Sequence, residues 1–304
     1  MSVDDKLTRR HTGFIAISGQ PNVGKSTLLN KMVHQKVTIT SPRPQTTRNI
    51  ITAILNNDST QAIFLDTPGF TNRSKDPLTR KMSKIAVTST VDADILLFIV
   101  DATKPDLELD KLLFKQIATS NKTNILLLNK VDLLKKKEIL GLIAIYSKSF
   151  PEFKEIVPVS AKTQFNIKKV LSIINNNLPL KDPIYPTDIV TNQPEKFFVG
   201  ELIREKAIFR LQGEVPYSMA ISVHKIEKKS PSLTKIYADI VVERDSQKQI
   251  VIGKSGAMIK AIGSAARKEL ESRLAVKIYL DLQVRTKKNW KQELDNSDYD
   301  NKLS

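Results

Sequence analysis

The stretch GQPNVGKS, residues 19–26, decides the fold of the first part of the chain because it matches the pattern G-x-x-x-x-G-K-[ST]. It follows the apolar run FIAIS (14–18), which predicts a buried strand, and it leads into STLLNKMV (26–33), which predicts a helix. In this context the glycines let backbone N–H groups wrap a β-phosphate, and the start of the helix favours negative charge. The stretch therefore predicts a nucleoside triphosphate site.

Two residues of this loop have specific expected roles. We expect Lys25 to reach the β- and γ-phosphates and Ser26 to bind Mg²⁺. The remaining candidate nucleotide contacts of the loop are Gly19, Gln20, Pro21, Asn22, Val23, Gly24 and Thr27. A chance glycine-rich turn would match the same pattern, so the reading depends on further motifs in the correct order.

The stretch FLDTPGFTN (64–72) follows another predicted strand, AIFLD (62–66). We expect Asp66 to hold the Mg²⁺ shell through water and the Gly69 N–H to meet the γ-phosphate. Its candidate nucleotide contacts are Asp66, Thr67, Pro68, Gly69 and Phe70. In Ras-like enzymes the residue after this glycine is usually a glutamine that orients the attacking water, and Phe70 cannot do so. Either the chain does not hydrolyse its nucleotide, or it uses other groups.

The motif NKVD (129–132) indicates the base. Guanine offers two adjacent donors, N1–H and the 2-amino group, and the carboxylate of Asp132 can accept both. Adenine lacks this pair, so the expected discrimination is on the order of 10⁴-fold or more. SAK (160–162) ends the next predicted strand and is also compatible with an ordinary turn. The candidate base contacts are Asn129, Lys130, Val131, Asp132, Ser160, Ala161 and Lys162.

The apolar runs of the first part alternate with segments of helical spacing. Runs that are apolar on both faces are typical of parallel strands covered by helices, so this part is predicted to be an α/β, doubly wound, mostly parallel sheet. The chemistry is then expected at the carboxyl ends of the strands. The predicted strands are residues 14–18, 62–66, 95–101, 125–130 and 156–160, and a helix is predicted over 110–120.

The pattern changes after a span that is rich in proline, which neither a helix nor a central strand continues through. Beyond it we predict a smaller α+β unit, with helices at 195–211 and 255–275 and strands at 217–226, 235–243 and 276–284. The expected organisation is a GTPase domain over 1–180, a linker over 181–194, an RNA-binding domain over 195–291 and a mobile tail over 292–304.

The second unit contains a G-x-x-G sequence, Gly253, Lys254, Ser255 and Gly256. It lies between an apolar IVI and an amphipathic helix, after two predicted strands and before a third. That order is similar to a type II KH domain, in which such a loop clamps a nucleic-acid backbone. Lys254 would add charge attraction. The alternative is a purely structural turn.

Composition limits the functional classes. The formal charge is +16 and the sequence pI is about 9.7, which favours a polyanionic partner over a basic enzyme without one. There are no cysteines, which excludes disulfides, thiolate catalysis and Cys-ligated metal sites. The first residues do not match a signal peptide, and the longest apolar run, 95–100, is far shorter than the ~20 residues of a membrane helix. We therefore expect a cytoplasmic protein.

Taken together, these motifs resemble the Era-type GTPases, Ras-like proteins with a C-terminal KH domain. QTTR (45–48), ELIREK (201–206) and GEVPYS (213–218) are similar to segments of that family, and the resemblance covers nearly the whole chain. It implies binding of 16S rRNA near its 3′ end, a role in small (30S) ribosomal subunit assembly, and peripheral association with the inner membrane. It also implies that Thr47 binds Mg²⁺ when GTP is present. A hydrophobic residue at the place of Phe70 is typical of the family, and we expect a monomer.

The resemblance leaves the hydrolytic mechanism open. Relatives with the same loop asparagine and TTR segment use a bound potassium ion, so Asn22 is a candidate K⁺ ligand beside the catalytic candidates Lys25, Thr47 and Gly69. The rival is that RNA or the ribosome supplies the missing group. A tRNA-modifying GTPase would need a folate-binding region and a terminal cysteine, which this chain lacks. An RNA-binding structural protein in which nucleotide only stabilises the fold, and a membrane-associated regulator, remain alternatives.

Overall fold

The computed structural model describes residues 9–41, 43, 46–69, 77–118, 122–288 and 290, without the side chains of 77–81 and 89. The chain divides into two compact units between Asn192 and Gln193. Phe70, part of QTTR and the 292–304 tail lie outside the described residues. Among the helices that are described, none combines the length and the hydropathy needed to cross a bilayer.

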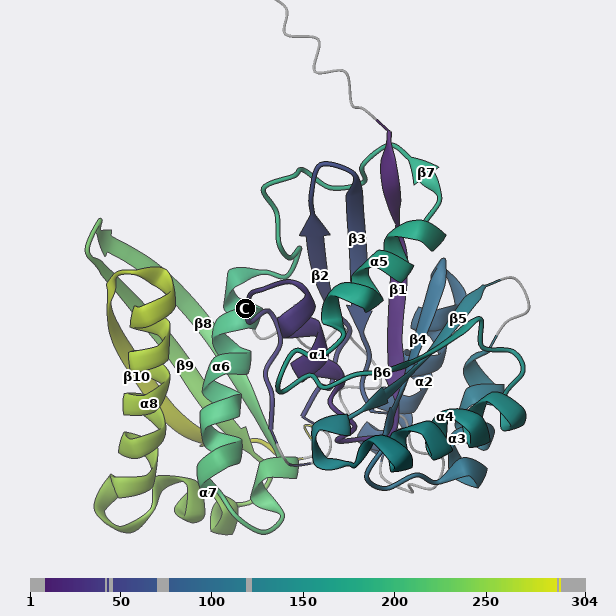
Figure 1. Ribbon diagram of the computed structural model, residues 1–304. Coiled ribbons are helices and arrows are strands. Elements are labelled where there is room, and N and C mark those ends of the chain that lie inside the picture. The colour runs from purple at the N-terminus through teal and green to yellow at the C-terminus, as the bar shows by residue number, and fades with distance from the viewer. Residues whose placement is uncertain are drawn as a thin grey trace, which may run out of the picture. The chain divides into compact units, whose positions relative to one another are not determined.

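The first unit is built on a sheet in the order β2-β3-β1-β4-β5-β6, with β7 paired to β1 (Figure 1). β1 runs parallel to β3 and β4, and β5 runs parallel to β4 and β6, as the doubly wound prediction requires. β2 is antiparallel to β3, and β7 is antiparallel to β1. The strands are β1 Arg10–Gly19, β2 Ile51–Asn56, β3 Thr60–Asp66, β4 Ile95–Asp101, β5 Thr123–Asn129, β6 Glu155–Pro158 and β7 Leu180–Lys181.

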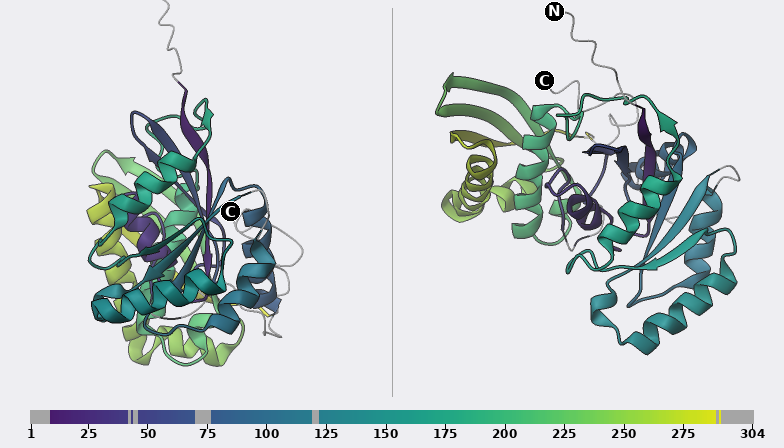
Figure 2. Two further views of the ribbon diagram at one scale, coloured as in Figure 1. Left: turned by 45° about the vertical axis from the view of Figure 1, so that its right-hand side comes forward. Right: turned by 45° about the horizontal axis from the view of Figure 1, so that its top comes forward.

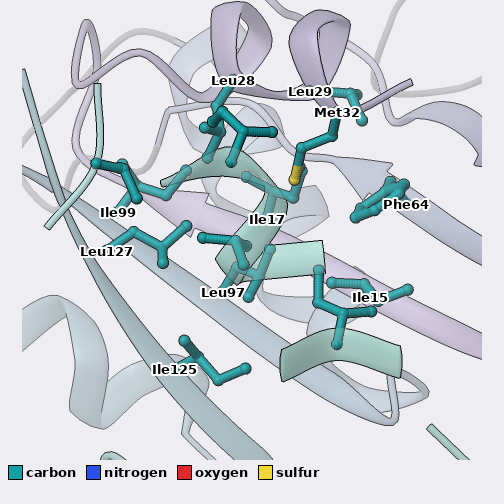
Figure 3. Packing of buried hydrophobic residues seen from close by; sticks show 14 of the residues in the cluster. Ile15, Ile17, Leu28, Leu29, Met32, Phe64, Leu97, Ile99, Ile125 and Leu127 are labelled. Carbon is teal, nitrogen blue, oxygen red and sulfur yellow. The ribbon is translucent and has the colours of Figure 1, made fainter. Parts of the chain in front are cut away.

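Helices cover both faces of this sheet, and each face has its own core because side chains alternate along a strand. Ile15 and Ile17 of β1 pack with α1 and α5, whereas Ala16 between them packs with α2, α3 and α4. Figure 3 shows the first core, where Leu28, Leu29 and Met32 of α1 meet the strand residues. The helices are α1 Lys25–Met32, α2 Pro77–Val91, α3 Leu107–Ile117, η1 Val131–Leu133, α4 Lys136–Ser149 and α5 Ile167–Asn177.

The second unit is a three-stranded sheet in the order β10-β9-β8 with helices packed on it (Figures 1 and 2). β8 and β9 are antiparallel, β9 and β10 are parallel, and α6 and α8 contact both each other and the sheet. This is the predicted small α+β fold. Its elements are α6 Glu195–Arg210, η2 Val215–Tyr217, β8 Met219–Ser230, β9 Leu233–Val242, α7 Asp245–Ile252, η3 Lys254–Gly256, α8 Ala257–Leu274 and β10 Lys277–Thr286.

The predicted proline-rich linker, residues 181–194, is hydrogen-bonded to strands β2 and β3 of the first sheet over much of its length. The Gln61 side chain accepts from the Ile184 and Tyr185 N–H groups at 2.6 and 2.9 Å. Further along, the Ile54 N–H donates to the Val190 carbonyl at 2.7 Å, and Thr191 Oγ1 donates to the Thr52 carbonyl at 2.6 Å. The segment is therefore fastened to β2 and β3 up to the point where the first unit ends.

Candidate functional site

The loop between β1 and α1 needs glycine at both ends. Gly19 has φ +146°, and a Cβ there would lie 2.2 Å from the Ile99 carbonyl oxygen. Gly24 has φ +101°, and its Cβ would lie 2.3 Å from Nδ2 of Asn129. A Cβ at residue 19 would collide with the backbone of β4, a Cβ at residue 24 would displace the Asn129 side chain, and both φ values are ones that L side chains rarely adopt. The loop therefore passes close to the carboxyl ends of these strands, where its N–H groups and the start of α1 together favour an anion.

Lys25, the first residue of α1, is held inside this loop. Its Nζ donates to the carbonyls of Gly19 at 3.1 Å and Gln20 at 2.8 Å. Burial lowers the pKa of Lys25 to about 8, although the nearby Asp66 carboxylate opposes the shift. The ammonium is thus placed where a phosphate chain in the loop would meet it.

Three oxygen-bearing side chains converge beside Lys25. Ser26 Oγ donates to Asp66 Oδ2 at 2.8 Å and lies 2.9 Å from Thr47 Oγ1. Asp66 is fully buried, and burial is the main cause that raises its pKa, against the effect of Lys25 and the surrounding hydroxyls. Within the described part of the chain, its Oδ1 is buried without a hydrogen-bond partner. A carboxyl oxygen without a hydrogen-bond partner, close to two hydroxyls, fits the oxygen ligands that a hard cation such as Mg²⁺ takes.

Thr38 is a member of this cluster that the sequence analysis did not identify. Its Oγ1 donates to Asp66 Oδ2 at 3.1 Å, and its backbone N–H and carbonyl are both bound by the Asn30 side chain, at 3.1 and 2.8 Å. No motif marks Thr38, because its role follows only from the way Asn30 of α1 fixes the loop after that helix. Gly69 lies over the same loop, since a Cβ there would be 2.8 Å from Pro21 Cα.

Asn129 ties three predicted motifs together at the end of β5. Its Nδ2 donates to the Val23 carbonyl at 2.7 Å, and its Oδ1 accepts from the Ala161 N–H at 3.0 Å. The neighbouring Lys130, with φ +67°, donates from Nζ to the Asn22 carbonyl at 2.9 Å and to Asp101 Oδ2 at 2.6 Å. Asp101 is a further site residue that the sequence analysis missed.

The carboxylate of Asp132 is exposed, and a hydrogen bond from Ser160 sets its orientation. Ser160 Oγ donates to its Oδ1 at 2.7 Å, and Ser160 in turn accepts from the Thr163 N–H at 3.1 Å. Ser160 is fully buried, whereas Asp132 and Lys162 are exposed. One carboxylate oxygen is therefore fixed by the protein, and the acid group stands at the surface with a set orientation.

The G-x-x-G loop of the second unit connects α7 to α8. Gly253, Ser255 and Gly256 have φ values of +71°, +51° and +77°, and a Cβ at Gly253 would lie 2.9 Å from the Met258 N–H nitrogen. Around Gly256, by contrast, a Cβ would meet no heavy atom within 4 Å. Lys254 and Ser255 are exposed. The loop is thus a tight, outward turn directly before the start of α8, a geometry that lets a phosphate backbone approach closely.

The fold and these two sites define a P-loop nucleotide-binding unit followed by a type II KH unit. A family profile described as 50S ribosome-binding GTPase matches residues 14–130, and a KH domain profile matches residues 214–291. The GTPase Era of Geotalea uraniireducens is 43% identical over 92% of this chain and 94% of its own length. That of Lacticaseibacillus paracasei is 40% identical over 96% of each chain. The chain belongs to the GTPase Era family.

Two solved structures agree with this assignment. Era in complex with MgGDPNP and nucleotides 1506–1542 of 16S ribosomal RNA is 38% identical, with a TM-score of 0.89, covering 94% of this chain and 97% of that one. A variant of Aquifex aeolicus Era bound to GDP·AlF4⁻ is also 38% identical, with a TM-score of 0.88, covering 93% and 96%. The similarity therefore extends over both units.

Proposed function

We propose that this GTPase is a GTP-driven switch that binds 16S rRNA near its 3′ end and assists assembly of the small (30S) ribosomal subunit. The observation that carries the proposal is that one chain combines the contact of Asn129 with the phosphate-loop backbone at Val23 and a tight, left-handed G-x-x-G turn at Gly253–Gly256. Support comes from the related Era that was solved with MgGDPNP and 16S rRNA nucleotides.

GTP and GDP bind through the loop residues 19–27, with Lys25 on the β- and γ-phosphates. Asp132, oriented by Ser160, accepts the two guanine donors, and Asn129 holds the phosphate loop and the 160–162 segment in one arrangement. Asp66, Thr67, Pro68, Gly69 and Phe70 line the γ-phosphate side in this proposal. The same residues serve GTP and GDP except those that meet the γ-phosphate.

Ser26 and Thr47 would hold Mg²⁺ directly, and Asp66 would hold it through water. When bound, the ion neutralises charge on the β- and γ-phosphates. The hydroxyls lie 2.9 Å apart, and Asp66 already accepts from Ser26. The described residues contain no cluster of three His, Cys, Asp or Glu that would suggest a different metal.

Hydrolysis in this chain belongs to the class with a hydrophobic residue in place of the catalytic glutamine. We propose that K⁺ bound at Asn22 supplies part of the missing charge stabilisation, as an arginine finger does elsewhere. Asn22 is exposed in the phosphate loop with φ +63°, and its carbonyl is held by Lys130. Turnover measured in potassium and in sodium buffers tests this: faster turnover in potassium supports it. Equal rates, with a large stimulation by rRNA in sodium, favour a group supplied by the RNA.

The switch requires a route from the nucleotide to the second unit. β2 begins four residues after Thr47, and its Thr52 carbonyl accepts from Thr191 Oγ1, which lies four residues before α6 begins. In this proposal, a change around Thr47 on GTP binding is passed along β2 and the fastened segment towards α6. Crosslinking of bound rRNA, with a GTP analogue and then with GDP, tests the RNA, its position and the switch together.

We further propose domain limits of 1–180, 181–194 and 195–291, with 292–304 as a tail, and a monomeric protein in the cytoplasm with peripheral attachment to the inner membrane. Sedimentation of the full chain tests the monomer. Flotation with vesicles containing anionic lipid tests the membrane attachment, and absence from the vesicle fraction at physiological salt contradicts it.

A further inference from the structure

A row of hydrogen-bonded polar side chains joins the phosphate loop to the helices α3 and α4. Gln20 Nε2 donates to Asp110 Oδ1 at 2.8 Å, and Tyr146 Oη donates to Asp110 Oδ2 at 2.7 Å. Asp110 belongs to α3 and Tyr146 to α4, and their exposed fractions are 1% and 0%. Neither residue belongs to the motifs that identify the nucleotide site.

This row of hydrogen-bonded side chains lowers the stability of the fold if its only role is structural. Burial raises the pKa of Asp110, and the hydrogen bonds from Gln20 and Tyr146 only oppose that rise. Its two hydrogen-bonding partners are neutral side chains in a core of apolar residues, where Tyr146 stacks on Phe150 with ring centroids 5.5 Å apart. A buried carboxylate costs free energy that an apolar residue of similar volume would avoid. The packing of Tyr146 nevertheless gives the carboxylate a rigid anchor.

The end of this row lies in the phosphate loop itself. The Gln20 side chain is held by Asp110, while the Gln20 carbonyl accepts from Lys25 Nζ at 2.8 Å. Asp110 of α3 therefore fixes the side chain of Gln20, and the backbone carbonyl of Gln20 orients the Lys25 ammonium, which would meet the phosphates. Movement of Gln20 would shift both the loop backbone and the resting position of Lys25.

We propose that Asp110 and Tyr146 are positioning residues for nucleotide binding, which hold Gln20 so that the phosphate loop is ordered before the nucleotide arrives. The inference rests on the proposed GTP function. Preorganisation lowers the free-energy cost of binding without adding a contact. Its loss therefore weakens the binding of the substrate and of the transition state by the same amount. GDP and GTP are affected equally, because both place a β-phosphate in the loop.

The test compares the full chain with Gln20→Met, Tyr146→Phe and the double variant. Gln20→Met keeps the length of the side chain and removes its amide, and Tyr146→Phe removes one hydroxyl. We expect Gln20→Met to speed GDP dissociation and raise the KM for GTP by about tenfold, with kcat changed by less than about twofold. Tyr146→Phe should have a smaller effect in the same direction, about threefold.

Two readouts separate positioning from loss of stability. Thr60→Val serves as the matched control. Thr60 is the first residue of β3, remote from the loop, and the substitution removes a buried hydroxyl that donates to Asn175 of α5. It should lower the melting temperature and leave GDP dissociation unchanged. Because Gln20 and Tyr146 act through one carboxylate, the double variant should show less than the product of the single effects. The preference for GTP over ATP should not change.

The outcomes are distinguishable. If the wild-type chain binds no guanine nucleotide, the proposed function fails before the variants are considered. If it binds and Gln20→Met dissociates GDP at the wild-type rate, or if the two substitutions multiply as independent sites, the positioning role is wrong. Where Gln20→Met does not fold, Tyr146→Phe carries the test by itself, and an unchanged dissociation rate in that variant contradicts the proposal.

Discussion

Ser160 and Asp132 are joined by a hydrogen bond of 2.7 Å from Ser160 Oγ to Asp132 Oδ1, across a sequence separation of 28 residues. The bond fixes the plane of a carboxylate that is otherwise exposed. It links the NKVD and SAK motifs, so in the proposed function Ser160 acts on the base by orienting Asp132.

Ser160→Ala should therefore weaken the affinity for GDP and GTP by about tenfold, because Asp132 loses its orientation while keeping its charge. Asp132→Asn should be more severe, on the order of 10² to 10⁴-fold, because an amide cannot accept both guanine donors. Titration with fluorescent GDP measures both. The control is ATP, whose weak binding should not fall further. Guanine affinity at the wild-type level in Asp132→Asn would remove Asp132 from the base site.

Thr47 should matter only when the γ-phosphate is present. Thr47→Ala is expected to weaken the Mg²⁺-dependent affinity for a non-hydrolysable GTP analogue by about tenfold, and to change GDP affinity by less than about twofold. The adjacent Thr46→Ala is the matched control, since Thr46 Oγ1 donates to the Arg43 carbonyl at 2.7 Å, whereas the hydroxyl that lies beside Ser26 Oγ is that of Thr47. Removal of Mg²⁺ with a chelator should make Thr47→Ala and the wild type indistinguishable. An equal loss for GDP would contradict the assigned role.

Asp101 gives a pH-dependent prediction. Burial tends to raise its pKa, but the hydrogen bonds from Lys130 and Thr103 prevail and hold the pKa below its ordinary value of 3.8. A carboxylate with a lowered folded-state pKa contributes stability above the ordinary pKa and loses it as the pH falls through the folded-state value. Asp101→Asn should thus reduce the free energy of unfolding by about 1 kcal/mol at pH 7.

The difference between Asp101→Asn and the wild type should shrink as the pH is lowered below the ordinary value of 3.8. Urea unfolding at several pH values measures it. A difference that is constant with pH would show that the contact with Lys130 carries no ionic contribution.

Much of the site was predictable because its signals are local. The glycines at positions 19 and 24, Lys25 and Ser26 lie within one loop, and each later motif directly follows an apolar strand. The fold class followed from the same apolar runs and is confirmed. β2, β7 and α7 were not predicted. β2 and β7 are short antiparallel strands, and α7 lies directly before the G-x-x-G loop, where only the apolar run IVI was noted.

The contacts that the sequence did not predict join distant residues. Thr38 meets Asp66 across 28 positions, Gln20 meets Asp110 across 90, and Thr191 meets Thr52 across 139. Such pairs depend on how the helices and loops pack on the sheet, and no spacing rule within a single segment encodes them. The role of Phe70 stays a prediction because it lies outside the described residues.

The KH loop should contribute charge to RNA binding and nothing to nucleotide binding. Lys254→Glu is expected to weaken binding of an RNA with the 3′-end sequence of 16S rRNA by about tenfold and to reduce the salt dependence of binding by about one ion. Lys136→Glu on α4 is the control with the same change in net charge at another exposed lysine. GDP affinity should be unaffected in both. Equal losses of RNA affinity in the two variants would show that net charge, and not the loop, governs binding.

The coupling between nucleotide and RNA should depend on the bond between Thr191 and Thr52. Thr191→Val removes the donor to the Thr52 carbonyl and keeps the β-branched shape. It should reduce the difference in RNA affinity between the GTP and GDP states and leave nucleotide affinity unchanged. Thr88→Val, at an exposed hydroxyl of α2 that bonds to its own helix, is the matched control. A full nucleotide effect in Thr191→Val would exclude this route.

The most direct test of the account is the affinity of the full wild-type chain for that RNA, measured once with a non-hydrolysable GTP analogue and Mg²⁺ and once with GDP and Mg²⁺. A switch predicts tighter binding in the presence of the GTP analogue, by about tenfold, which is a typical coupling between two sites. Equal RNA affinities in the two nucleotide states would contradict it.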